Sequence, residues 1–464
     1  MKLKKLSALL LAAAMLVTAA PQIAVPALAE ETTEATTGTA IEVTKSFDAY
    51  KIDGTNASKK VPSYKNKLAE RVFTKAFADK AKKGVYPGLE DTDALYLVFT
   101  LKRSGYKNDS FYKKVAAKIT SQAKAIKKNG KTTGDFSGEK VTVSLKTYST
   151  PSSWGSVETE KHLAKVILCA SSLGLKADNL GGLNFIKELA KKSNLNASAN
   201  YPTSREMMML LAIDSGDYKL PTGKSYVTRQ ELVDALTGDA LDQNIENSYG
   251  IVDATVMMIS PLMPYYSSDK NVAAAYKKVD DFVATEGKNA DETTNFVNNQ
   301  YSVAQVLLTM GENRLNSFGG FDRDQIIAYA NKAAKAELAN DAFTSLSAQL
   351  LRAYTSMSYA LKDDSNTLYR SIANPVSTLK ADKKTLSLKK GKKAKVTIQV
   401  TSADSRASFG PVSYNKKAVS KIAKVSTKST NKKLVVTVKA TKKGTAKLLL
   451  SVGGKKVALK ITVK

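Results

Sequence analysis

The sequence predicts a multidomain α plus β protein in which a ring of paired helices precedes a β-sandwich. The first observation is the stretch Tyr249–Val283, where a helix that is apolar on nearly every side is followed by a helix with one polar face. A helix without a polar face is buried all round, and similar pairs recur along the chain. The second observation is that helical periodicity ends near Asn374, where short alternating runs begin.

The chain begins with a predicted secretory signal peptide over residues 1–29. Lysines precede the apolar run Leu6–Ala20, and Ala27-Leu28-Ala29 supplies the small residues of a cleavage site. A retained membrane anchor is the alternative, but the apolar run is short for a span and is followed by prolines. The sequence therefore predicts an exported protein with no membrane span in its mature form.

Residues 30–61 form a polar leader that is rich in Thr and Glu, and we expect it to be disordered or loosely packed. The only cysteine, Cys169, lies in a predicted buried helix. One cysteine allows no intrachain disulfide, so stability has to come from the core. An exported protein without disulfides fits a bacterial surface.

Helix pairs repeat between residues 62 and 374. If the breaks after the buried helices are placed at Gly105, Gly174, Gly216, Tyr265 and Gly311, the intervals are 69, 42, 49 and 46 residues. A period of about 45 residues with two helices each indicates an αα-repeat array. A further buried run, Phe343–Tyr359, brings the number of buried helices to six. Six favour a closed ring, because ring neighbours cover one another; an unrelated helical bundle is the alternative.

The long first interval contains an insertion, Lys128–Ser156. Its apolar residues alternate at Val141, Val143 and Leu145, which predicts a short strand or hairpin.

Residues 375–464 are predicted to form a β-sandwich, because runs such as Lys433–Ala440 and Lys455–Val463 alternate apolar and polar residues between glycine turns. Thr378–Lys464 holds 24 Lys and Arg against 2 acids, whereas the whole chain has a net charge of +29. The basic character therefore belongs mainly to the sandwich, with lysines on its outer faces. These lysines contact a polyanion, such as an anionic wall polymer, or protect the sheet edges. Nucleic acid is disfavoured, because arginine and aromatic side chains are scarce there.

The helical repeats resemble the α/α toroid superfamily of terpenoid cyclases and protein prenyltransferases. They are more closely similar to the squalene-cyclase-like domains of exported Gram-positive surface proteins. The resemblance rests on Val252–Tyr266, Asn298–Gly311, Gly319–Ala333 and Asp341–Tyr359. It implies an α/α toroid of about six αα-hairpins over residues 62–374.

The catalytic motifs of these enzymes are missing. Asp91-Thr92-Asp93 is followed by Ala94, so the Asp-x-Asp-Asp motif of squalene cyclases is incomplete, and one tryptophan cannot supply their Gln-to-Trp repeats. His162 and Cys169 do not make the zinc site of prenyltransferases, since zinc needs at least three protein ligands. We therefore expect no catalytic residue, no metal and no cofactor. Ring-shaped relatives include polysaccharide lyases and corrinoid carriers. A glycan-processing enzyme (lyase or hydrolase) and a corrinoid-type small-molecule carrier are thus the alternatives.

The sandwich resembles the bacterial Ig-like group 2 domain through Lys383–Val400, Val412–Ser426 and Lys439–Val463, with Tyr414 where many members carry an aromatic residue. The resemblance implies a spacer, stalk or adhesive module. No Leu-Pro-x-Thr-Gly sorting motif precedes Lys464, so we expect attachment to be noncovalent.

An aromatic residue precedes most of the predicted buried helices and is followed by carboxylates or amides. The inner helices of a ring are parallel, so these residues lie at one end and form a candidate rim for a glycan, a peptide or a small amphiphile. Helix capping by the acids is the alternative. Together these features predict a secreted, cell-wall-associated protein with a non-catalytic binding or adhesion role. The rim residues are Tyr86, Asp91, Asp93, Trp154, Glu158, Glu160, Tyr201, Glu206, Tyr249, Asp253, Tyr301 and Gln305.

Overall fold

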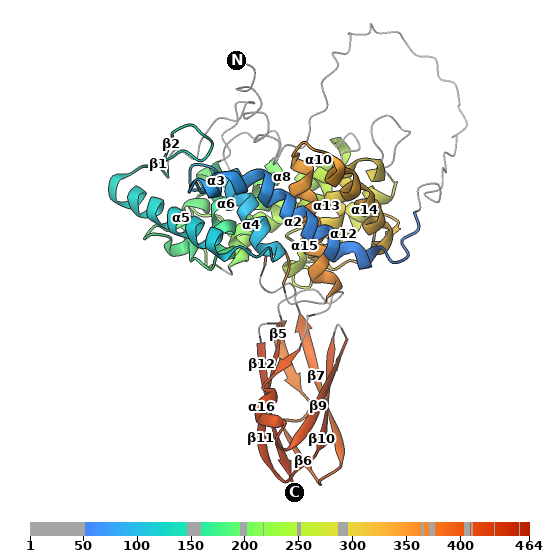
Figure 1. Ribbon diagram of the computed structural model, residues 1–464. Helices are drawn as coiled ribbons and strands as arrows, with labels where there is room; N and C mark the ends of the chain where they lie inside the picture. The colour runs from blue at the N-terminus through green and yellow to red at the C-terminus, as the bar shows by residue number, and fades with distance from the viewer. Residues whose placement is uncertain are drawn as a thin grey trace, which may run out of the picture.

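The computed structural model has a helical part followed by a β-domain (Figure 1). The α plus β character predicted from the sequence is therefore confirmed. The predicted signal peptide and most of the polar leader lie outside the described residues. Those residues are 52–145, 159–194, 202–216, 218–247, 252–285, 296–362, 366–370, 376–402, 409, 412–430, 432–453 and 455–464.

Six helices that are buried along most of their length form the inside of the helical domain. Each contacts the next in chain order, and the last also contacts the first, so the contacts run in a closed cycle. The cycle explains how apolar helices avoid water, since each is covered by two neighbours. These inner helices are α4 (Thr92–Ser104), α6 (Thr159–Ser172), α8 (Pro202–Ser215), α11 (Val252–Ile259), α13 (Gln300–Asn313) and α15 (Ser345–Leu361).

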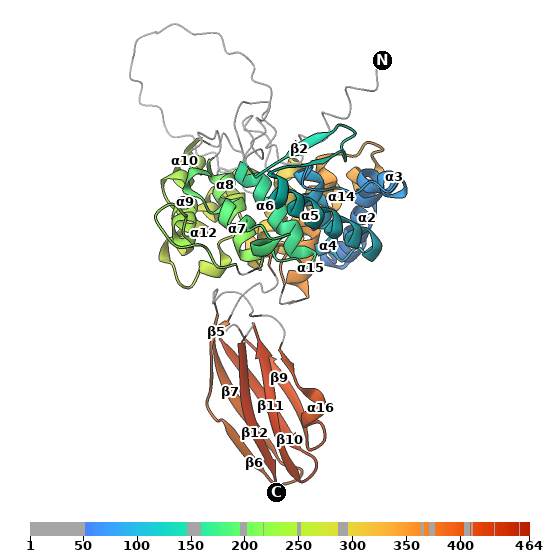
Figure 2. The same ribbon diagram turned by 90° about the vertical axis from the view of Figure 1, so that its left-hand side faces the viewer.

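A second set of helices lies outside this cycle (Figure 2). Four of them pack on the inner helix that precedes them: α7 (Phe185–Leu189), α9 (Arg229–Thr237), α12 (Lys270–Thr285) and α14 (Arg323–Ala339). Two more are α5 (Asp109–Asn129), which follows α4, and α10 (Asp239–Asn247), which follows α9. The last inner helix, α15, is covered by α2 (Val61–Phe73) from the start of the domain. A π-helical turn, Thr74–Ala78, joins α2 to α3 (Asp79–Lys82). A helix from the start of the domain thus completes the last helix pair.

Glycines set the ends of some inner helices but not of all. Gly105 follows α4 with φ of 82°, and Gly174 lies shortly after α6 with φ of 76°; this left-handed conformation favours glycine. The predicted break at Gly311 is wrong, because Gly311 lies inside α13. A methyl group there would come within 2.6 Å of the Met357 backbone nitrogen, so glycine allows α13 and α15 to pack closely. The helix ends instead at Asn313.

The predicted hairpin in the insertion is confirmed, since β1 (Thr132–Gly134) pairs antiparallel with β2 (Val141–Val143). The end of the polar leader differs from the expectation of loose packing. Ala57 and Val61 are buried, and the Asn331 side chain of α14 donates to the Ala57 carbonyl at 3.2 Å. These two apolar side chains hold the last leader residues on the helical domain, which therefore includes residues from 52 onward.

The β-domain consists of two four-stranded sheets that pack face to face, since one buried apolar cluster draws residues from both. All strand pairs are antiparallel except β6 with β12, which is parallel. A short helix, α16 (Lys416–Val419), follows β8. One sheet has the order β5 (Val376–Ala381), β7 (Lys393–Ser402), β10 (Lys433–Ala440) and β9 (Ala423–Ser429). The other has the order β6 (Thr385–Leu388), β12 (Lys455–Val463), β11 (Gly444–Val452) and β8 (Ser413–Tyr414).

The lysines of the β-domain lie on its surface. Every lysine in the described part of this domain is exposed, whereas alternate residues such as Leu434, Val436 and Val438 are buried between the sheets. The predicted lysine coat is therefore present. Of the two acids in this region, Asp382 accepts a hydrogen bond from the Thr397 backbone N–H at 3.1 Å.

Candidate functional site

The first turns of four inner helices carry half-buried side chains among positions that are mostly buried. In each helix the two side chains are four residues apart, which places them on one face. Because α11, α13 and α15 are covered outside by α12, α14 and α2, this face is the inner one. We call these positions the mouth: Asp93 and Leu97 of α4, Asp253 and Met257 of α11, Tyr301 and Gln305 of α13, and Ser345 and Gln349 of α15.

An ion pair lies at the mouth between α4 and α6. The Lys165 ammonium donates to Asp93 Oδ1 at 2.5 Å, and the Lys165 side chain is 5 % exposed against 26 % for Asp93. Beside this pair, Thr92 Oγ1 and His162 Nδ1 lie 2.6 Å apart. Asp93 thus compensates a buried lysine whose charge would be costly alone, and its carboxylate keeps access to solvent.

Asp91 caps α4, because its Oδ1 accepts a hydrogen bond from the Ala94 backbone N–H at 2.9 Å. Its second oxygen, Oδ2, is buried without a hydrogen-bond partner. Burial raises the pKa of Asp91 to about 6, against the opposing effect of the Ala94 hydrogen bond. For this residue the capping alternative is confirmed. Ionisation of the capping carboxyl is unfavourable, because the buried carboxylate is poorly solvated.

Two more predicted acids lie in partly desolvated positions. At the start of α8, the Arg205 guanidinium donates to Glu206 Oε1 at 2.7 Å, and both residues are buried. Glu206 Oε2 is buried without a hydrogen-bond partner. In α11, burial raises the pKa of Asp253 above its usual value, while backbone N–H groups at the start of the helix oppose the rise.

Tyr301 brings an aromatic ring to the mouth. The Asn299 side chain caps α13 by accepting from the Tyr301 backbone N–H at 3.0 Å. The Ser345 hydroxyl of α15 lies 3.4 Å from the Tyr301 hydroxyl, to which it donates. The half-buried tyrosine therefore presents a polar tip and an apolar ring at the junction of α13 and α15.

Four of the predicted rim residues occupy matching half-buried positions near the starts of inner helices, namely Asp93, Asp253, Tyr301 and Gln305. Tyr86 lies instead near α5, with its ring 6.1 Å from that of Phe111 and its carbonyl accepting from Lys118 at 2.7 Å. Glu160 lies in the first turn of α6, but its side chain is outside the described residues, and so are Trp154, Glu158, Tyr201 and Tyr249.

Sequence reasoning missed Lys165, Ser345 and Gln349 at the mouth. Lys165 interrupts the apolar run of α6, and that interruption was a usable signal, because an unpaired lysine is rarely buried. Ser345 and Gln349 are uncharged polar residues and gave no comparable signal.

The opposite end of the inner cycle is filled by the segment Asn366–Arg370, which we call the floor segment. Arg103, at the end of α4, donates to its Leu368 and Arg370 carbonyls at 2.8 and 3.0 Å. The Leu368 N–H donates to Glu312 Oε1, near the end of α13, at 2.8 Å. The Arg370 guanidinium donates to the carbonyl of Pro261, just after α11, at 3.3 Å. Because these partners lie at or just beyond the C-terminal ends of three different inner helices, the segment lies inside the cycle.

Tyr369 is the main apolar contact of the floor segment. Its ring stacks on Phe99 with centroids 5.6 Å apart, and its hydroxyl lies 2.7 Å from that of Tyr96. Burial raises the pKa of Tyr369 well above its usual value. The sequence signal that could have located this segment is the apolar pair Leu368-Tyr369 within the otherwise polar stretch that follows α15.

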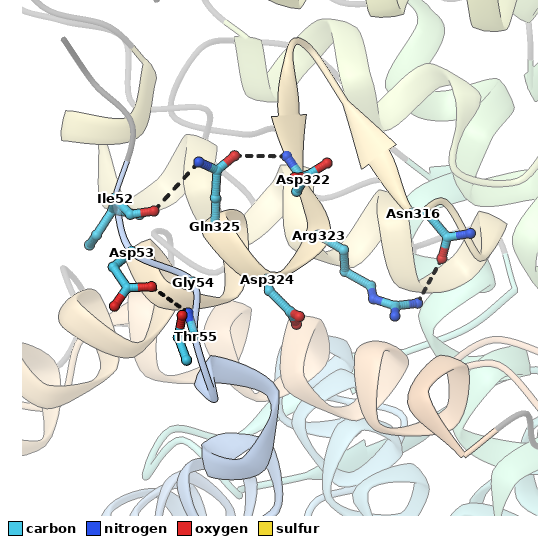
Figure 3. Close-up of a pocket in the computed structure, with 9 residues that line it drawn as sticks. All are labelled: Ile52, Asp53, Gly54, Thr55, Asn316, Asp322, Arg323, Asp324 and Gln325. Atoms are coloured by element: carbon cyan, nitrogen blue, oxygen red, sulfur yellow. Dashed lines mark hydrogen bonds between the residues drawn. The ribbon is translucent and has the colours of Figure 1, made fainter. Parts of the chain in front are cut away.

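A separate surface pocket of about 570 Å³ lies where the leader meets α14 (Figure 3). The Gln325 side chain accepts from the Asp322 backbone N–H at 3.0 Å and donates to the Ile52 carbonyl at 3.5 Å. These contacts hold the leader beside the hairpin of β3 (Ser317–Phe318) and β4 (Phe321–Asp322). The pocket is lined by Ile52, Asp53, Gly54, Thr55, Asn316, Asp322, Arg323, Asp324 and Gln325.

Among the described residues, no group of three or more His, Cys, Asp or Glu side chains could hold a metal ion. Cys169 is buried, and burial raises the pKa of its thiol, so the reactive thiolate is disfavoured. Within the same part of the chain, no helix combines the length and the apolar character that crossing a bilayer requires.

Comparison with known proteins gives little guidance. No family model matches the chain, and no curated protein matches it. A crystal structure of domains 4 and 5 of the S-layer protein SbsC is 21% identical, with a TM-score of 0.16, and the match covers 19% of this chain and 53% of that chain. A structure of SbsC domains 5–6 is also 21% identical with a TM-score of 0.16, covering 20% of this chain and 45% of that one. The match thus spans about half the length of these structures, and TM-scores this low carry no argument about fold or function.

Proposed function

We propose that this protein is a secreted, cell-envelope-associated binding or adhesion protein that holds its ligand at the mouth without transforming it. One observation carries the proposal: matching positions in the first turns of four inner helices are half-buried. An inner helix of a closed cycle is covered on its flanks and outside, so exposure there indicates an interior that is open at that end.

We assign the helical domain to the α/α toroid class and the β-domain to the Ig-like sandwiches. The closed cycle of contacts among the inner helices supports the first assignment, together with the completion of the last pair by α2. Two four-stranded sheets packed on one apolar cluster support the second.

The mouth favours a ligand that has both polar groups and apolar faces. Leu97, Met257 and the ring of Tyr301 offer apolar surface, while the amides of Gln305 and Gln349 offer donors and acceptors. Sites for small molecules commonly combine apolar lining with a few placed polar groups. A glycan, a peptide or a small amphiphile meets this description.

The lysine coat supports retention at an anionic cell wall. The exposed lysines of the β-domain face few acids of their own, since Thr378–Lys464 contains only 2. A dense positive surface attracts polyanions over roughly a Debye length, about 8 Å at physiological ionic strength. Retention on purified walls should therefore decrease steeply as salt is added.

A glycan-processing enzyme is the second candidate. It is favoured by the burial of Asp253 at the mouth, which raises the pKa of this carboxyl above its usual value, the direction seen in the general acids of glycosidases. Incubating the mature protein with purified wall glycans and measuring reducing ends or unsaturated products decides between the candidates. New product ends would favour the enzyme, and their absence would favour binding alone.

The test of the binding proposal compares the mature protein with a variant carrying Asp93→Asn, Glu160→Gln and Asp253→Asn. Affinity for solubilised wall fragments is measured by calorimetry, and helicity is checked by circular dichroism. We expect the variant to keep its helicity and to lose binding at least about tenfold, since hydrogen bonds to charged groups contribute about 1.5–3 kcal/mol each. Unchanged affinity would contradict the proposal.

A further inference from the structure

Arg352 of α15 is a buried arginine whose charge is not neutralised by a neighbouring carboxylate. It is 7 % exposed, and its Nη1 is buried without a hydrogen-bond partner. Its guanidinium lies over the ring of Tyr96, 4.8 Å from the centroid. No hydrogen bond or ion pair joins this guanidinium to another residue in the described part of the chain. A buried charge left in this state is costly, so its presence needs an explanation.

The position of Arg352 places it one turn below the mouth. Ser345, Gln349 and Arg352 are spaced by four and three residues, so they follow one face of α15. The first two are half-buried mouth residues, and the third is deeper. Tyr96, on which Arg352 lies, also bonds to Tyr369 of the floor segment. The guanidinium therefore lies between the open mouth and the filled floor.

A buried carboxylate, Glu312, also lies within the cycle, but no ion pair joins it to Arg352 in the described part of the chain. Glu312 of α13 accepts from the Ser356 hydroxyl at 2.6 Å and from the Leu368 N–H at 2.8 Å through its Oε1. Both partners lie towards the floor, since Ser356 is one turn beyond Arg352 on α15. Through Oε1, Glu312 thus holds the floor segment, while its Oε2 is buried without a hydrogen-bond partner.

Two acids near the starts of the inner helices are paired with other cations. Asp93 holds Lys165, and Glu206 holds Arg205. The remaining mouth acid, Asp253, lies on α11 rather than beside α15 in the cycle of contacts. In the described part of the chain, Arg352 and Arg370 are both buried without a paired carboxylate. Arg370 donates to the Pro261 carbonyl within the floor, whereas Arg352 lies one turn below the mouth.

We propose that Arg352 is the anchor for a carboxylate of the ligand that enters through the mouth. A guanidinium offers parallel N–H groups that match the two oxygens of a carboxylate, and the bond is strongest where water is excluded. The ring of Tyr96 holds the guanidinium in place through a cation–π contact. The carboxylate comes from a uronic-acid sugar or from a peptide C-terminus. This inference rests on the mouth being a binding site, and it adds that the ligand is an acid.

The test measures the preference of the protein for an acid over its neutral counterpart. One pair of probes is glucuronic acid against glucose, and the other is acetyl-Gly-Ala-Ala against its C-terminal amide. Binding to the mature protein is followed by ligand-observed NMR. We expect one of the two acids to bind at least about tenfold more tightly than its neutral partner, because charge-assisted hydrogen bonds are among the strongest in proteins. The pair that shows the preference identifies the source of the carboxylate.

Two variants of the anchor and one control sharpen the test. Arg352→Met keeps an unbranched side chain over Tyr96 but has no charge, and it should reduce the preference to about one. It should also melt at a higher temperature than the wild type, because an unpaired buried charge has been removed. Arg352→Lys keeps the positive charge but lacks the parallel N–H groups of a guanidinium, and it should retain only part of the preference for acids. Arg103→Lys, at the floor, should lower stability and leave the preference unchanged.

A wild-type protein that binds acids and neutral probes equally would overturn the assignment of Arg352 while leaving the mouth as a binding site. An Arg352→Met variant that keeps the full preference would have the same consequence. If neither the four probes nor solubilised wall fragments bind, the proposed function itself fails together with the anchor.

Discussion

The two ends of the inner cycle differ in what fills them. At the C-terminal ends of the inner helices, the floor segment supplies Tyr369 to the rings of Tyr96 and Phe99, and its backbone bonds to Arg103 and Glu312. At the N-terminal ends, the corresponding inward positions are half-buried. The inner helices therefore hold a segment of their own chain at one end, while four of them carry half-buried inward positions at the other end.

The floor also shows how this interior recognises a peptide-like occupant. A guanidinium donates to carbonyls, a carboxylate accepts from an N–H, and an aromatic residue stacks inside. The mouth offers Asp93 and Tyr301, with Arg352 one turn below them, but it has no internal occupant among the described residues. The difference is that backbone hydrogen bonds and the Tyr369 ring hold the floor, whereas the mouth leaves half-buried polar side chains in contact with solvent.

The largest expected effect is a difference in stability loss between truncating a tyrosine at the floor and truncating one at the mouth. Tyr369→Ala should destabilise the helical domain by about 3–5 kcal/mol, the range for truncating a large buried aromatic side chain. Tyr301→Ala, at the half-buried mouth, should cost less than about 1 kcal/mol, because part of its ring already contacts water. Chemical denaturation followed by circular dichroism at the helical signal measures both. Equal losses for the two variants would show that the ends are packed alike.

The second prediction concerns how the free energy of unfolding depends on pH through Asp91, the N-cap of α4. The carboxyl of Asp91 has an ordinary pKa of 3.8 and a pKa of about 6 in the folded protein. Because the folded state binds this proton more tightly than the unfolded chain, ionisation opposes folding. The penalty is absent below the ordinary value and complete above the folded value, where a shift of about two units corresponds to about 3 kcal/mol.

Asp91→Asn preserves an N-cap side chain but cannot ionise. We therefore expect the variant to be more stable than the wild type by about 1–3 kcal/mol at neutral pH, with the difference shrinking as the pH falls towards 4. Denaturation curves at several pH values measure it. A difference that stays constant with pH, or a variant that is less stable at neutral pH, would show that the carboxylate is well solvated.

The smallest effect on stability is expected from changes to the lysine coat. The coat belongs to the β-domain, so its substitution should leave both ends of the inner cycle unchanged. Replacing Lys424, Lys428 and Lys433 by Gln should change the unfolding free energy by no more than about 0.5 kcal/mol per site, because these side chains are exposed. Retention on purified walls should weaken and become less sensitive to salt. Binding of small probes at the mouth should not change. A loss of probe binding would mean that the two domains are coupled.

Local patterns predicted much of this fold. Apolar periodicity identified runs such as Val303–Leu315 and Phe343–Tyr359, and alternation identified strands such as Lys433–Ala440, because both signals depend on residues close in sequence. Gly105 and Gly174 lie at predicted breaks for the same reason. Asp93, Asp253, Tyr301 and Gln305 were predicted from their place at helix entrances, and they occupy half-buried positions at the mouth.

Features that depend on distant contacts escaped prediction. Gly311 resembles a helix break in sequence, but its role is to let α15 approach. The floor segment and the pairing of α2 with α15 join residues that are more than half the chain apart, as in the bond between Tyr96 and Tyr369. Arg352 looks like an ordinary polar position until its burial is known.

Hydrogen–deuterium exchange with and without solubilised wall fragments shows whether the ligand binds at the mouth, because it reports on both ends of the cycle in one experiment. If the mouth binds the ligand, we expect slower exchange in the first turns of α4, α11, α13 and α15, with no change at Leu368 and Tyr369. Slower exchange confined to the β-domain, or at the floor and not at the mouth, would contradict it.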